Sequence, residues 1–392
     1  GPVNLGRLEA IPELVERADL KFPVFRPRIP ERLRHSENIF STIAEGDILL
    51  HHPYESFVPF IEMLHQAAND PQVVSIRQTL YRTGAGSGVA DALLKAAHAG
   101  KDVLVVIELR ARFDEAANIE LANALQAAGA QVVYGVVGHK THAKMCMIIR
   151  REGRRLVRYV HLGTGNYHER TARAYTDYGL LSSDQELGQD VQKIFQQIAA
   201  LGKAGKLKAI LQSPFTLHSG VLELIEIQRQ KALQGQPALI QAKMNALTEP
   251  SVIRALYGAS QAGVHIDLII RGICCLRPGV KGVSENIRVR SIVGRFLEHM
   301  RVYCFGVDEE REVFLSSADW MDRNLFRRVE ACFPVRDPVL AKRVYREAMS
   351  NYLSDNTQAW ELTSDGSYRK LKSRGKAHTA QSALLLDLTD HA

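Results

Sequence analysis

Two histidines in this sequence each stand just before an apolar segment and two positions ahead of a cation. The first pair is His142 with Lys144, and the second is His299 with Arg301. A neutral imidazole is a competent nucleophile near pH 7 and can take up a phosphoryl group as a phosphohistidine. Side chains two positions apart on a strand share a face, so each cation would meet the charge that develops on the phosphoryl oxygens. The pattern predicts phosphoryl transfer, in which one histidine attacks and the other holds or protonates the leaving oxygen.

The segments around the two pairs repeat in one order along the chain. Each half contains a helix that leads into an apolar strand, a strand opened by the histidine pair, and a strand followed by small polar residues. The strands are expected at 103–107, 145–149 and 159–162 in the first half, and at 266–270, 302–305 and 313–315 in the second. The polar residues include Gly163 and Asn166 in the first half, and Ser316 and Asp319 in the second. This order indicates a duplicated α/β unit, in which two half-sites face each other to form one active site.

Arginines at the ends of predicted strands form a second set of candidates, namely Arg82, Arg110, Arg112 and Arg271. A guanidinium group binds phosphate through paired contacts, and α/β folds gather ligands at the C-terminal ends of their strands. We therefore expect these arginines to bind phosphate. The glycine-rich segment 84–88 lacks the Lys-Ser or Lys-Thr of a P-loop, so nucleotide binding would use arginines, a histidine and loops. Three histidines near the first pair are expected to be structural: His139, His161 and His168.

The composition limits the class of protein. A chain of 392 residues with 46% hydrophobic content can bury the cores of two or three domains. Lys and Arg total 50 against 43 Asp and Glu, and the net charge of +7 suggests a polyanionic partner. Five cysteines without C-x-x-C spacing indicate neither a disulfide framework nor a zinc site. Because no segment resembles a membrane-spanning helix or a signal peptide, a cytoplasmic protein is expected.

Several short strings carry a more specific resemblance. They are LYR at 80–82, ARFDE at 111–115, THAK at 141–144, GTGNY at 163–167, YTDY at 175–178, RFLEH at 295–299 and SSADWM at 316–321. The duplicated H-x-K and G-T-G-N elements resemble the phospholipase D superfamily, and the whole set resembles polyphosphate kinases of the long, histidine-phosphorylating type. The resemblance runs from about Phe22 to about Tyr352 and covers the two C-terminal catalytic domains of that family. It implies an α/β fold of two phospholipase D-like domains in tandem, each a mixed, mostly parallel β-sheet flanked by helices.

The resemblance also implies a division of the chain and an activity. Residues 1–28 are interpreted as the scar of a cleaved tag and the remnant of a preceding region, 29–209 as the first catalytic domain, 210–352 as the second, and 353–392 as its C-terminal tail. The implied activity is the reversible transfer of the terminal phosphate of ATP to inorganic polyphosphate, with release of ADP. ATP, ADP and polyphosphate are the implied partners, Mg²⁺ is the implied cofactor, and no nucleic acid is expected. A homo-oligomer is implied for the full-length parent, whereas the oligomeric state of this fragment and peripheral association with a membrane stay open.

Individual residues receive roles from the same resemblance. His142 corresponds to the autophosphorylated nucleophile, and His299 to a second histidine that protonates the leaving group or contacts the nucleotide phosphate. The positions that contact ATP correspond to Tyr175, Arg271 and His299. Arg82 and Arg112 match positions assigned to the magnesium-phosphate site. Arginine offers only hydrogen-bond donors, so magnesium is expected on phosphate oxygens beside these two side chains.

Two positions depart from the phospholipase D pattern. The aspartate that normally follows the motif lysine by five residues falls at Ile149, and the second motif lysine is replaced by Arg301. Both departures argue against a phosphodiesterase. Two alternatives nevertheless stay open: a phospholipase D-like phosphodiesterase that cleaves diesters without ATP, and a truncated polyanion-binding module without turnover.

Overall fold

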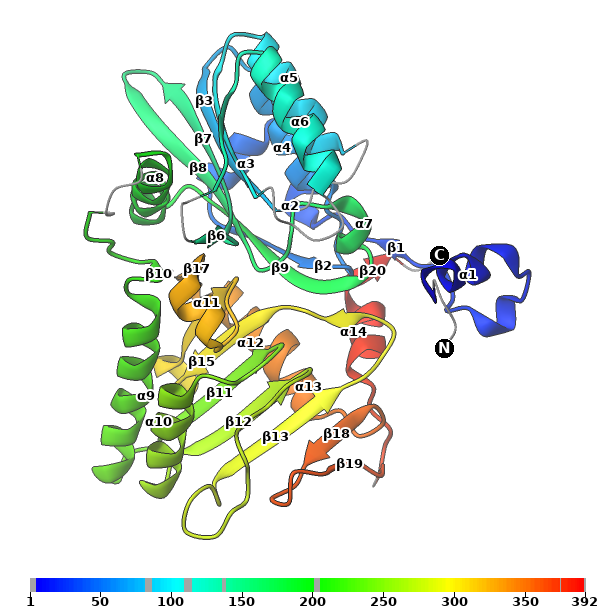
Figure 1. Cartoon of the computed structure of the whole chain (residues 1–392), viewed down its shortest axis with the longest axis vertical. Helices are drawn as coiled ribbons and strands as arrows, with labels where there is room; N and C mark the ends of the chain where they lie inside the picture. Colours follow the sequence, from blue (N-terminus) through cyan, green and yellow to red (C-terminus); the bar gives the residue numbers. More distant parts are fainter. Residues whose placement is uncertain are drawn as a thin grey trace.

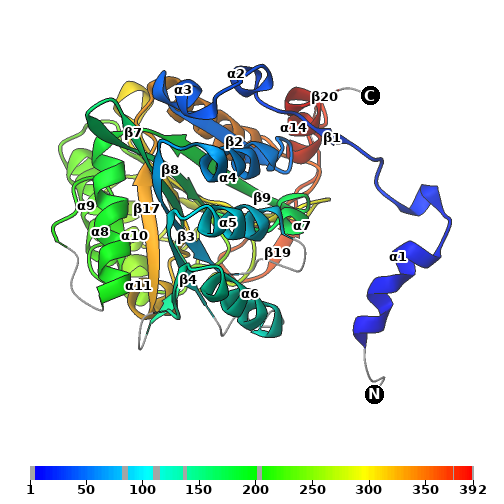
Figure 2. The same cartoon turned by 90° about the horizontal axis from the view of Figure 1, so that it is seen from above.

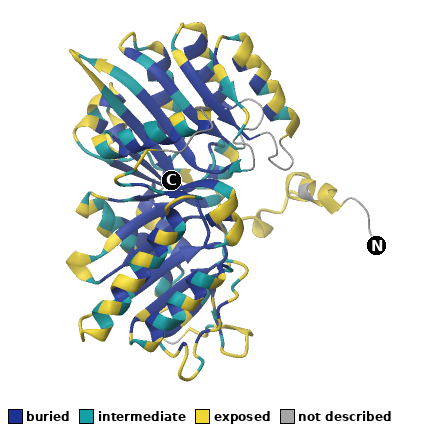
Figure 3. Ribbon diagram, turned by 60° about the vertical axis from the view of Figure 1, so that its left-hand side comes forward, coloured by how far each residue is buried: buried dark blue, intermediate teal, exposed yellow. Residues whose placement is uncertain are grey.

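The computed structural model describes residues 5–81, 87–108, 115–135, 139–200, 205–373 and 375–390. Two α/β halves are stacked on each other, with the first half above the second in Figure 1. The N-terminal segment extends away from both halves and contains α1 (Ile11–Leu14) between two 3₁₀ turns (Leu5–Ala10 and Ala18–Leu20) (Figure 2). Figure 3 shows that buried residues concentrate in the strands of both halves, whereas this segment is exposed.

Within the described residues, the first half is built on a sheet of eight strands. Their order is β14 (Leu297–Glu298), β9 (Tyr175–Ser182), β8 (Arg155–Gly163), β7 (Lys144–Glu152), β3 (Val73–Leu80), β4 (Asp102–Ile107) and β5 (Gln131–Val133), with β2 (Ile48–His52) also paired to β9. The helices of this half are α2 (Glu31–Arg34), α3 (Ile39–Ala44), α4 (Val58–Asn69), α5 (Gly88–His98), α6 (Glu115–Ala127), α7 (Glu169–Ala172) and α8 (Gln185–Ala200). Residues 103–107 of β4 are all buried, as expected for a strand covered on both faces.

The second half is built on a sheet of ten strands within the described ranges. Their order is β10 (Leu211–Ser213), β17 (Arg328–Pro334), β16 (Glu312–Ser316), β15 (Arg301–Phe305), β11 (Leu239–Met244), β12 (His265–Ile270), β13 (Ile287–Ile292), β18 (Ala359–Leu362) and β19 (Tyr368–Lys370), with β6 (Lys140–Thr141) also paired to β17. Its helical segments are α9 (Leu217–Leu233), α10 (Pro250–Gln261), a 3₁₀ turn (Asp308–Glu310), α11 (Asp322–Arg327), α12 (Pro338–Tyr345), a π-helical turn (Arg346–Ser350), α13 (Asn351–Leu353) and α14 (Ala380–Leu388). After α14, β20 (Thr389–Asp390) pairs with β1 (Arg26–Pro27) and brings the C-terminal end of the described chain beside the start of the first half.

The prediction of two mixed sheets flanked by helices is confirmed, but its claim that they are mostly parallel is corrected. Parallel pairs join β3 to β4 to β5 and β11 to β12 to β13. Short connections join β7 to β8 and β15 to β16, and such connections can only reverse the chain direction. Antiparallel pairs therefore outnumber parallel pairs among the described strands of both sheets.

Each half contributes a short strand to the sheet of the other. β6 belongs by sequence to the first half but pairs in parallel with β17, with Thr141 opposite Val329. β14 belongs by sequence to the second half but pairs in parallel with β9, with Leu297 opposite Tyr175. One buried hydrophobic cluster also includes side chains from both halves, such as Met145 and Val302. The two halves therefore share a core between their sheets.

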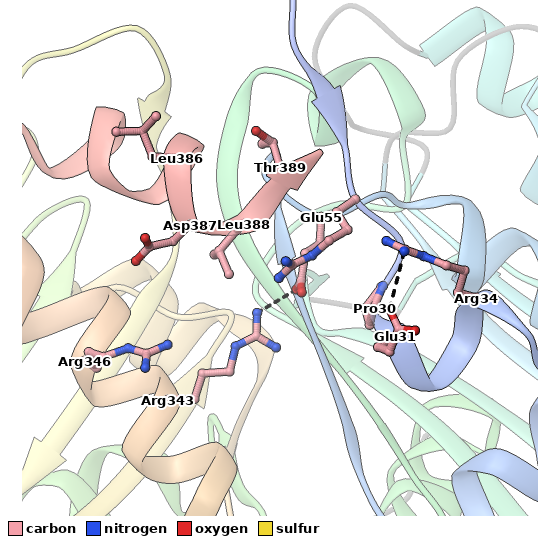
Figure 4. Close-up of a pocket in the computed structure, with 11 residues that line it drawn as sticks. Pro30, Glu31, Arg34, Glu55, Arg343, Arg346, Leu386, Asp387, Leu388 and Thr389 are labelled. Carbon is pink, nitrogen blue, oxygen red and sulfur yellow. Dashed lines mark hydrogen bonds and ion pairs between the residues drawn. The ribbon is translucent and has the colours of Figure 1, made fainter. Parts of the chain in front are cut away.

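A buried network of charged groups makes a further contact between the halves. Arg343 of α12 donates to Glu55 at 2.8 Å and to Glu347 at 2.8 Å, and Glu347 also lies 2.8 Å from Nδ1 of His51 on β2. Beside this network is a pocket of about 860 Å³, into which Figure 4 shows the Arg343–Glu55 pair pointing. The pocket is lined by Arg28, Pro30, Glu31, Arg34, Glu55, Arg343, Arg346, Leu386, Asp387, Leu388 and Thr389. Removing one member of such a buried network would leave an uncompensated charge, which is strongly destabilising.

Among the helices of the described ranges, none has both the length and the apolar character that crossing a bilayer would require.

Candidate active site

The two motif histidines are each paired with a carboxylate from the opposite half. Nδ1 of His142 lies 2.8 Å from Oε2 of Glu330, which stands on β17 of the second half. Nδ1 of His299 lies 2.8 Å from Oδ2 of Asp177, which stands on β9 of the first half. A carboxylate accepts a hydrogen bond from Nδ1–H of a neutral imidazole, so the lone pair of each ring is on Nε2. Each half thus supplies one imidazole and the group that orients the other imidazole.

The strands exchanged between the halves place both histidines. After β6 pairs with β17, the backbone N–H groups of His142 and Ala143 both donate to the carbonyl of Val329, at 2.9 and 2.8 Å. After β14 pairs with β9, the backbone N–H of His299 donates to the hydroxyl of Thr176 at 3.1 Å. Each histidine therefore stands one residue beyond a pairing with the other half. Each of these strand pairings spans only two residues, and the backbone hydrogen bonds of the following residues extend it.

The two motif cations are both buried, but their contacts differ. Lys144 donates its ammonium to the carbonyl of His142. Arg301 makes a bidentate ion pair with Asp319, in which Nε donates to Oδ1 at 3.2 Å and Nη2 donates to Oδ2 at 3.1 Å. Its Nη1 donates to the carbonyl of His299 at 2.8 Å and lies 3.2 Å from Nε2 of the same residue. The structure therefore brings each cation beside its histidine. Lys144 contacts a carbonyl and lies 5.3 Å from the centroid of the Tyr81 ring, whereas Arg301 makes a bidentate pair with a carboxylate.

Burial and surrounding charges control the protonation of the site. Burial, followed by the positive charges of Lys144 and Arg328, holds the pKa of His142 well below its ordinary value. Burial also lowers the pKa of His299, although the charge of Asp177 opposes the shift. Both imidazoles are therefore predominantly neutral at pH 7 in the unliganded protein, which is the form that a nucleophile needs.

The pKa values of the two carboxylates are shifted in opposite directions. Burial raises the pKa of Glu330, even though Lys144 and Arg328 favour its charged form. Burial would also raise the pKa of Asp177, but contacts with His299 and Thr164 outweigh it and hold the pKa below the ordinary value. Glu330 can therefore share a proton with its histidine more readily than Asp177 can.

The G-T-G-N segment after β8 supports Asp177. The hydroxyl of Thr164 donates to Oδ1 of Asp177 at 2.6 Å. A Cβ atom at Gly165 would lie 2.3 Å from Oδ2 of Asp177, so only glycine fits there. Gly163 ends β8 opposite Lys144, and the side-chain oxygen of Asn166 is buried without a hydrogen-bond partner among the described residues. This oxygen can accept a hydrogen bond from a donor group of a ligand or from water.

Two of the residues expected at the nucleotide lie around His299. The ring of Tyr175 is 5.3 Å from the ring of His299, measured between centroids. Nη1 of Arg271 donates to the carbonyl of Glu298, the residue before His299, at 2.8 Å. Burial and then the charge of Arg301 lower the pKa of Arg271. The remaining arginine candidates, Arg82, Arg110 and Arg112, lie outside the described residues.

Sequence reasoning missed the acidic residues of this site, Glu330 and Asp177 as partners of the histidines and Asp319 as the partner of Arg301. A spacing signal was present for the first two. Asp177 follows Gly163 by 14 positions, and Glu330 follows Ser316 by 14 positions, which extends the duplication by one further landmark. The pairing itself could not be found this way, because each acid binds the histidine of the opposite half.

No cluster of three or more His, Cys, Asp or Glu side chains suited to a metal ion occurs in the part of the chain that the structure describes. The carboxylates nearest the histidines are already occupied, Asp177 by Thr164 and His299, and Glu330 by His142 and Ser317. The described side chains therefore do not themselves form a magnesium site, since magnesium requires several oxygen ligands in octahedral geometry.

Each half of the chain matches a known protein family. Residues 38–204 match the family described as "Polyphosphate kinase C-terminal domain 1", and residues 210–382 match "Polyphosphate kinase C-terminal domain 2". The chain belongs to the polyphosphate kinase family. Of the site described above, His142 and Asp177 lie in the first polyphosphate kinase domain, and His299 and Glu330 lie in the second.

Individual polyphosphate kinases match nearly the whole chain. The chain is 59% identical over 390 residues to a polyphosphate kinase of Xylella fastidiosa, covering 99% of this chain and 55% of that protein. It is 56% identical over 392 residues to a polyphosphate kinase of Pseudomonas syringae, covering 100% of this chain and 53% of that protein. The chain therefore spans little more than half the length of the curated polyphosphate kinases that it matches.

Solved structures agree with this placement. The crystal structure of polyphosphate kinase from Porphyromonas gingivalis matches with a TM-score of 0.88 and 35% identity, covering 96% of this chain and 58% of that chain. A phosphatidylserine synthase from Haemophilus influenzae matches with a TM-score of 0.55 and 12% identity, covering 86% of this chain and 92% of that one. The second match shows a shared fold alone.

Proposed function

We propose that this chain carries out the reversible transfer of the terminal phosphate of ATP to inorganic polyphosphate through a phosphohistidine at His142. The observation that carries the proposal is the pairing of a buried, neutral His142 with Glu330, in a chain that contains both C-terminal domains of the polyphosphate kinase family. ATP, ADP and polyphosphate are the proposed ligands. The net charge of +7 suits such polyanions.

In the first step, the lone pair on Nε2 of His142 attacks the terminal phosphorus of ATP. The N–P bond forms as the bond from phosphorus to the bridging oxygen breaks, and ADP leaves with that electron pair. The proton on Nδ1 faces Glu330, which stabilises the positive charge that develops on the ring. In the second step, a terminal oxygen of polyphosphate attacks the same phosphorus and the N–P bond breaks. A phosphoramidate and a phosphoanhydride are both energy-rich, so the sequence can run in either direction.

The remaining residues receive roles around this centre. We propose that Lys144 and Arg301 stabilise charge on the transferred phosphoryl group, and that Gly163 and Asn166 belong to the phosphate-binding wall. Tyr175, Arg271 and His299 are proposed to contact the nucleotide. A general acid must carry its proton before transfer, whereas the lowered pKa leaves His299 neutral in the free protein, with a lone pair on Nε2 that cannot donate to a phosphate oxygen. The negative charge of a bound nucleotide would raise that pKa, and the protonated Nε2 could then donate to a phosphate oxygen or protonate the leaving oxygen.

Arg82, Arg110 and Arg112 are proposed as further phosphate ligands outside the described residues. We propose that Mg²⁺ is carried on phosphate oxygens beside Arg82 and Arg112, where it would neutralise phosphate charge. No step above depends on it.

We also propose that the two catalytic domains divide between 209 and 210, with 353–392 as the C-terminal tail of the second domain. The support is that α8 of the first half ends at Ala200 and β10 of the second sheet begins at Leu211. The tail adds β18 and β19 to the edge of the second sheet.

Labelling with γ-labelled ATP tests the proposal. Incubation with Mg²⁺ is expected to give acid-labile, base-stable label that chases into polyphosphate, and His142→Gln is expected to abolish it. His139→Gln, which changes a partly buried histidine three positions away, is the matched control and should retain the label. Label that survives His142→Gln would contradict the assignment. Diester cleavage without ATP would favour a phosphodiesterase, and polyphosphate binding without any label would favour a binding module.

A further inference from the structure

The C-terminal helix α14 contacts the segment that carries His299. Figure 1 shows α14, in red, at the junction of the two halves. The side chain of Gln381 in α14 is buried and makes a reciprocal pair with the backbone of Phe296. The N–H of Phe296 donates to Oε1 of Gln381 at 3.0 Å, and Nε2 of Gln381 donates to the carbonyl of Phe296 at 3.0 Å. The same Nε2 donates to Oε1 of Glu298 at 2.5 Å.

Glu298 in turn contacts residues of two further strands, β9 and β11. Its Oε2 accepts the hydroxyl of Thr176 at 3.0 Å, and this is the hydroxyl that accepts the backbone N–H of His299. The same oxygen lies 2.7 Å from Nζ of Lys243 on β11. Nζ of Lys243 is also 3.0 Å from the centroid of the Tyr352 ring. Both carboxylate oxygens of Glu298 are therefore engaged, which is the condition under which a buried charge is tolerated.

The segment needs this support because its own backbone pairing is short. β14 comprises only Leu297 and Glu298. Close packing adds a further constraint, since a Cβ atom at Gly294 would lie 2.5 Å from Oε1 of Gln381. The first half holds His142 differently, through two backbone hydrogen bonds to Val329. Loss of the Gln381 contacts should consequently disturb His299 and leave His142 in place.

We propose that α14 is part of the catalytic apparatus, with Gln381 as a positioning residue that sets the location of His299 through Phe296 and Glu298. The inference rests on the proposed function insofar as His299 acts on the nucleotide. It gives the C-terminal tail a role in the chemistry in addition to its role in packing.

Kinetics of the 392-residue chain provide the first test. Gln381→Met keeps the length of the side chain and removes all three hydrogen bonds, and it is expected to lower kcat about tenfold while the KM for polyphosphate stays unchanged, because small misplacements of a reacting group are costly. Ser382→Ala changes the exposed neighbour on the same helix and should leave both constants unchanged. A wild-type kcat in Gln381→Met would overturn the proposal.

Histidine NMR provides a second test that does not require turnover. The ¹³Cε1 resonance of His299, assigned by its loss in His299→Gln, is expected to shift in Gln381→Met, whereas the resonances of His142 and the exposed His265 stay in place. The charged groups that face His299 are Asp177, Arg301 and Lys144, and none of them is altered by this variant.

The two tests separate the possible failures. A general loss of structure would move the resonances of His142 and His299 together and would contradict a positioning role. An unmoved His299 resonance would contradict it as well. Glu298→Gln, which keeps the shape of the partner and removes its charge, offers an independent variant and should shift the same resonance. If the wild-type chain takes no label from ATP while the His299 resonance still shifts in Gln381→Met, the proposed function fails and the positioning of His299 by α14 stands.

Discussion

The two half-sites repeat one pattern but differ in the acid and in the cation beside the imidazole. His142 is paired with the longer Glu330, whose pKa is raised by burial, and its neighbour Lys144 donates to a backbone carbonyl and lies over the ring of Tyr81. His299 is paired with Asp177, whose pKa is lowered, and its neighbour Arg301 is fixed by a two-pronged pair with Asp319. The first half has the features of a centre that forms and breaks a bond, with an acid that can share a proton and a cation that is not fixed by a carboxylate fork. The second half has the features of a rigid site that binds negative charge.

Exchanging each acid for its amide tests this contrast with the largest expected effect. Glu330→Gln can present its NH₂ group to Nδ1 of His142, which forces the proton onto Nε2 and removes the nucleophilic lone pair. Loss of the correct tautomer in a comparable acid–histidine pair costs about 10⁴-fold, so we expect a loss of about 10³- to 10⁴-fold in the single-turnover rate of labelling by ATP. Asp177→Asn is the matched variant of the other half and should cost at least tenfold less, because the attacking imidazole is untouched. A larger loss in Asp177→Asn would reverse the assignment of the nucleophile.

Removing the cation should lower the free energy of unfolding more in the second half than in the first. Arg301→Met leaves Asp319 buried without its partner, and breaking such a pair costs about 3–5 kcal/mol in the free energy of unfolding, measured with urea. Lys144→Met should cost less, because burial already disfavours the charged lysine. Arg327→Met removes an exposed pair with Asp322 and is the control, with an expected change of under about 1 kcal/mol. Equal losses for the two buried cations would remove the proposed difference in rigidity.

The pH dependence of kcat/KM should show the smallest effect. Burial lowers the pKa of Lys144 to about 7, so the free protein loses this positive charge as the pH rises through 7. We expect kcat/KM for ATP to fall on that alkaline side, because the uncharged amine no longer stabilises phosphoryl oxygens. Lys144→Arg keeps its charge at every accessible pH and should move the decline to higher pH. The acid limb should lie below pH 6.5, since the pKa of His142 is lowered, and it should be the same in both proteins.

The sequence predicted the regular elements of this molecule better than their pairing. The strands expected at 145–149 and 302–305 lie within β7 and β15, because continuous apolar runs are a strong signal. The histidine–cation pairs were found for the same reason, as repeated residue types at fixed spacing. The exchange of β6 and β14 had no such signal, since two residues contain no periodicity. Glu330 is 188 positions from His142, so only the folded chain shows that the two are partners.

The exchanged strands have a consequence for how this protein can change over evolutionary time. Because β6 completes the second sheet and β14 completes the first, neither duplicated unit retains a whole site of its own after separation. A substitution that shifts β17 acts on the histidine of the other unit, and a substitution that shifts β9 does the same in return. Substitutions near β9 and β17 are therefore expected to be compensated across the two halves, because each acid binds the histidine of the opposite half.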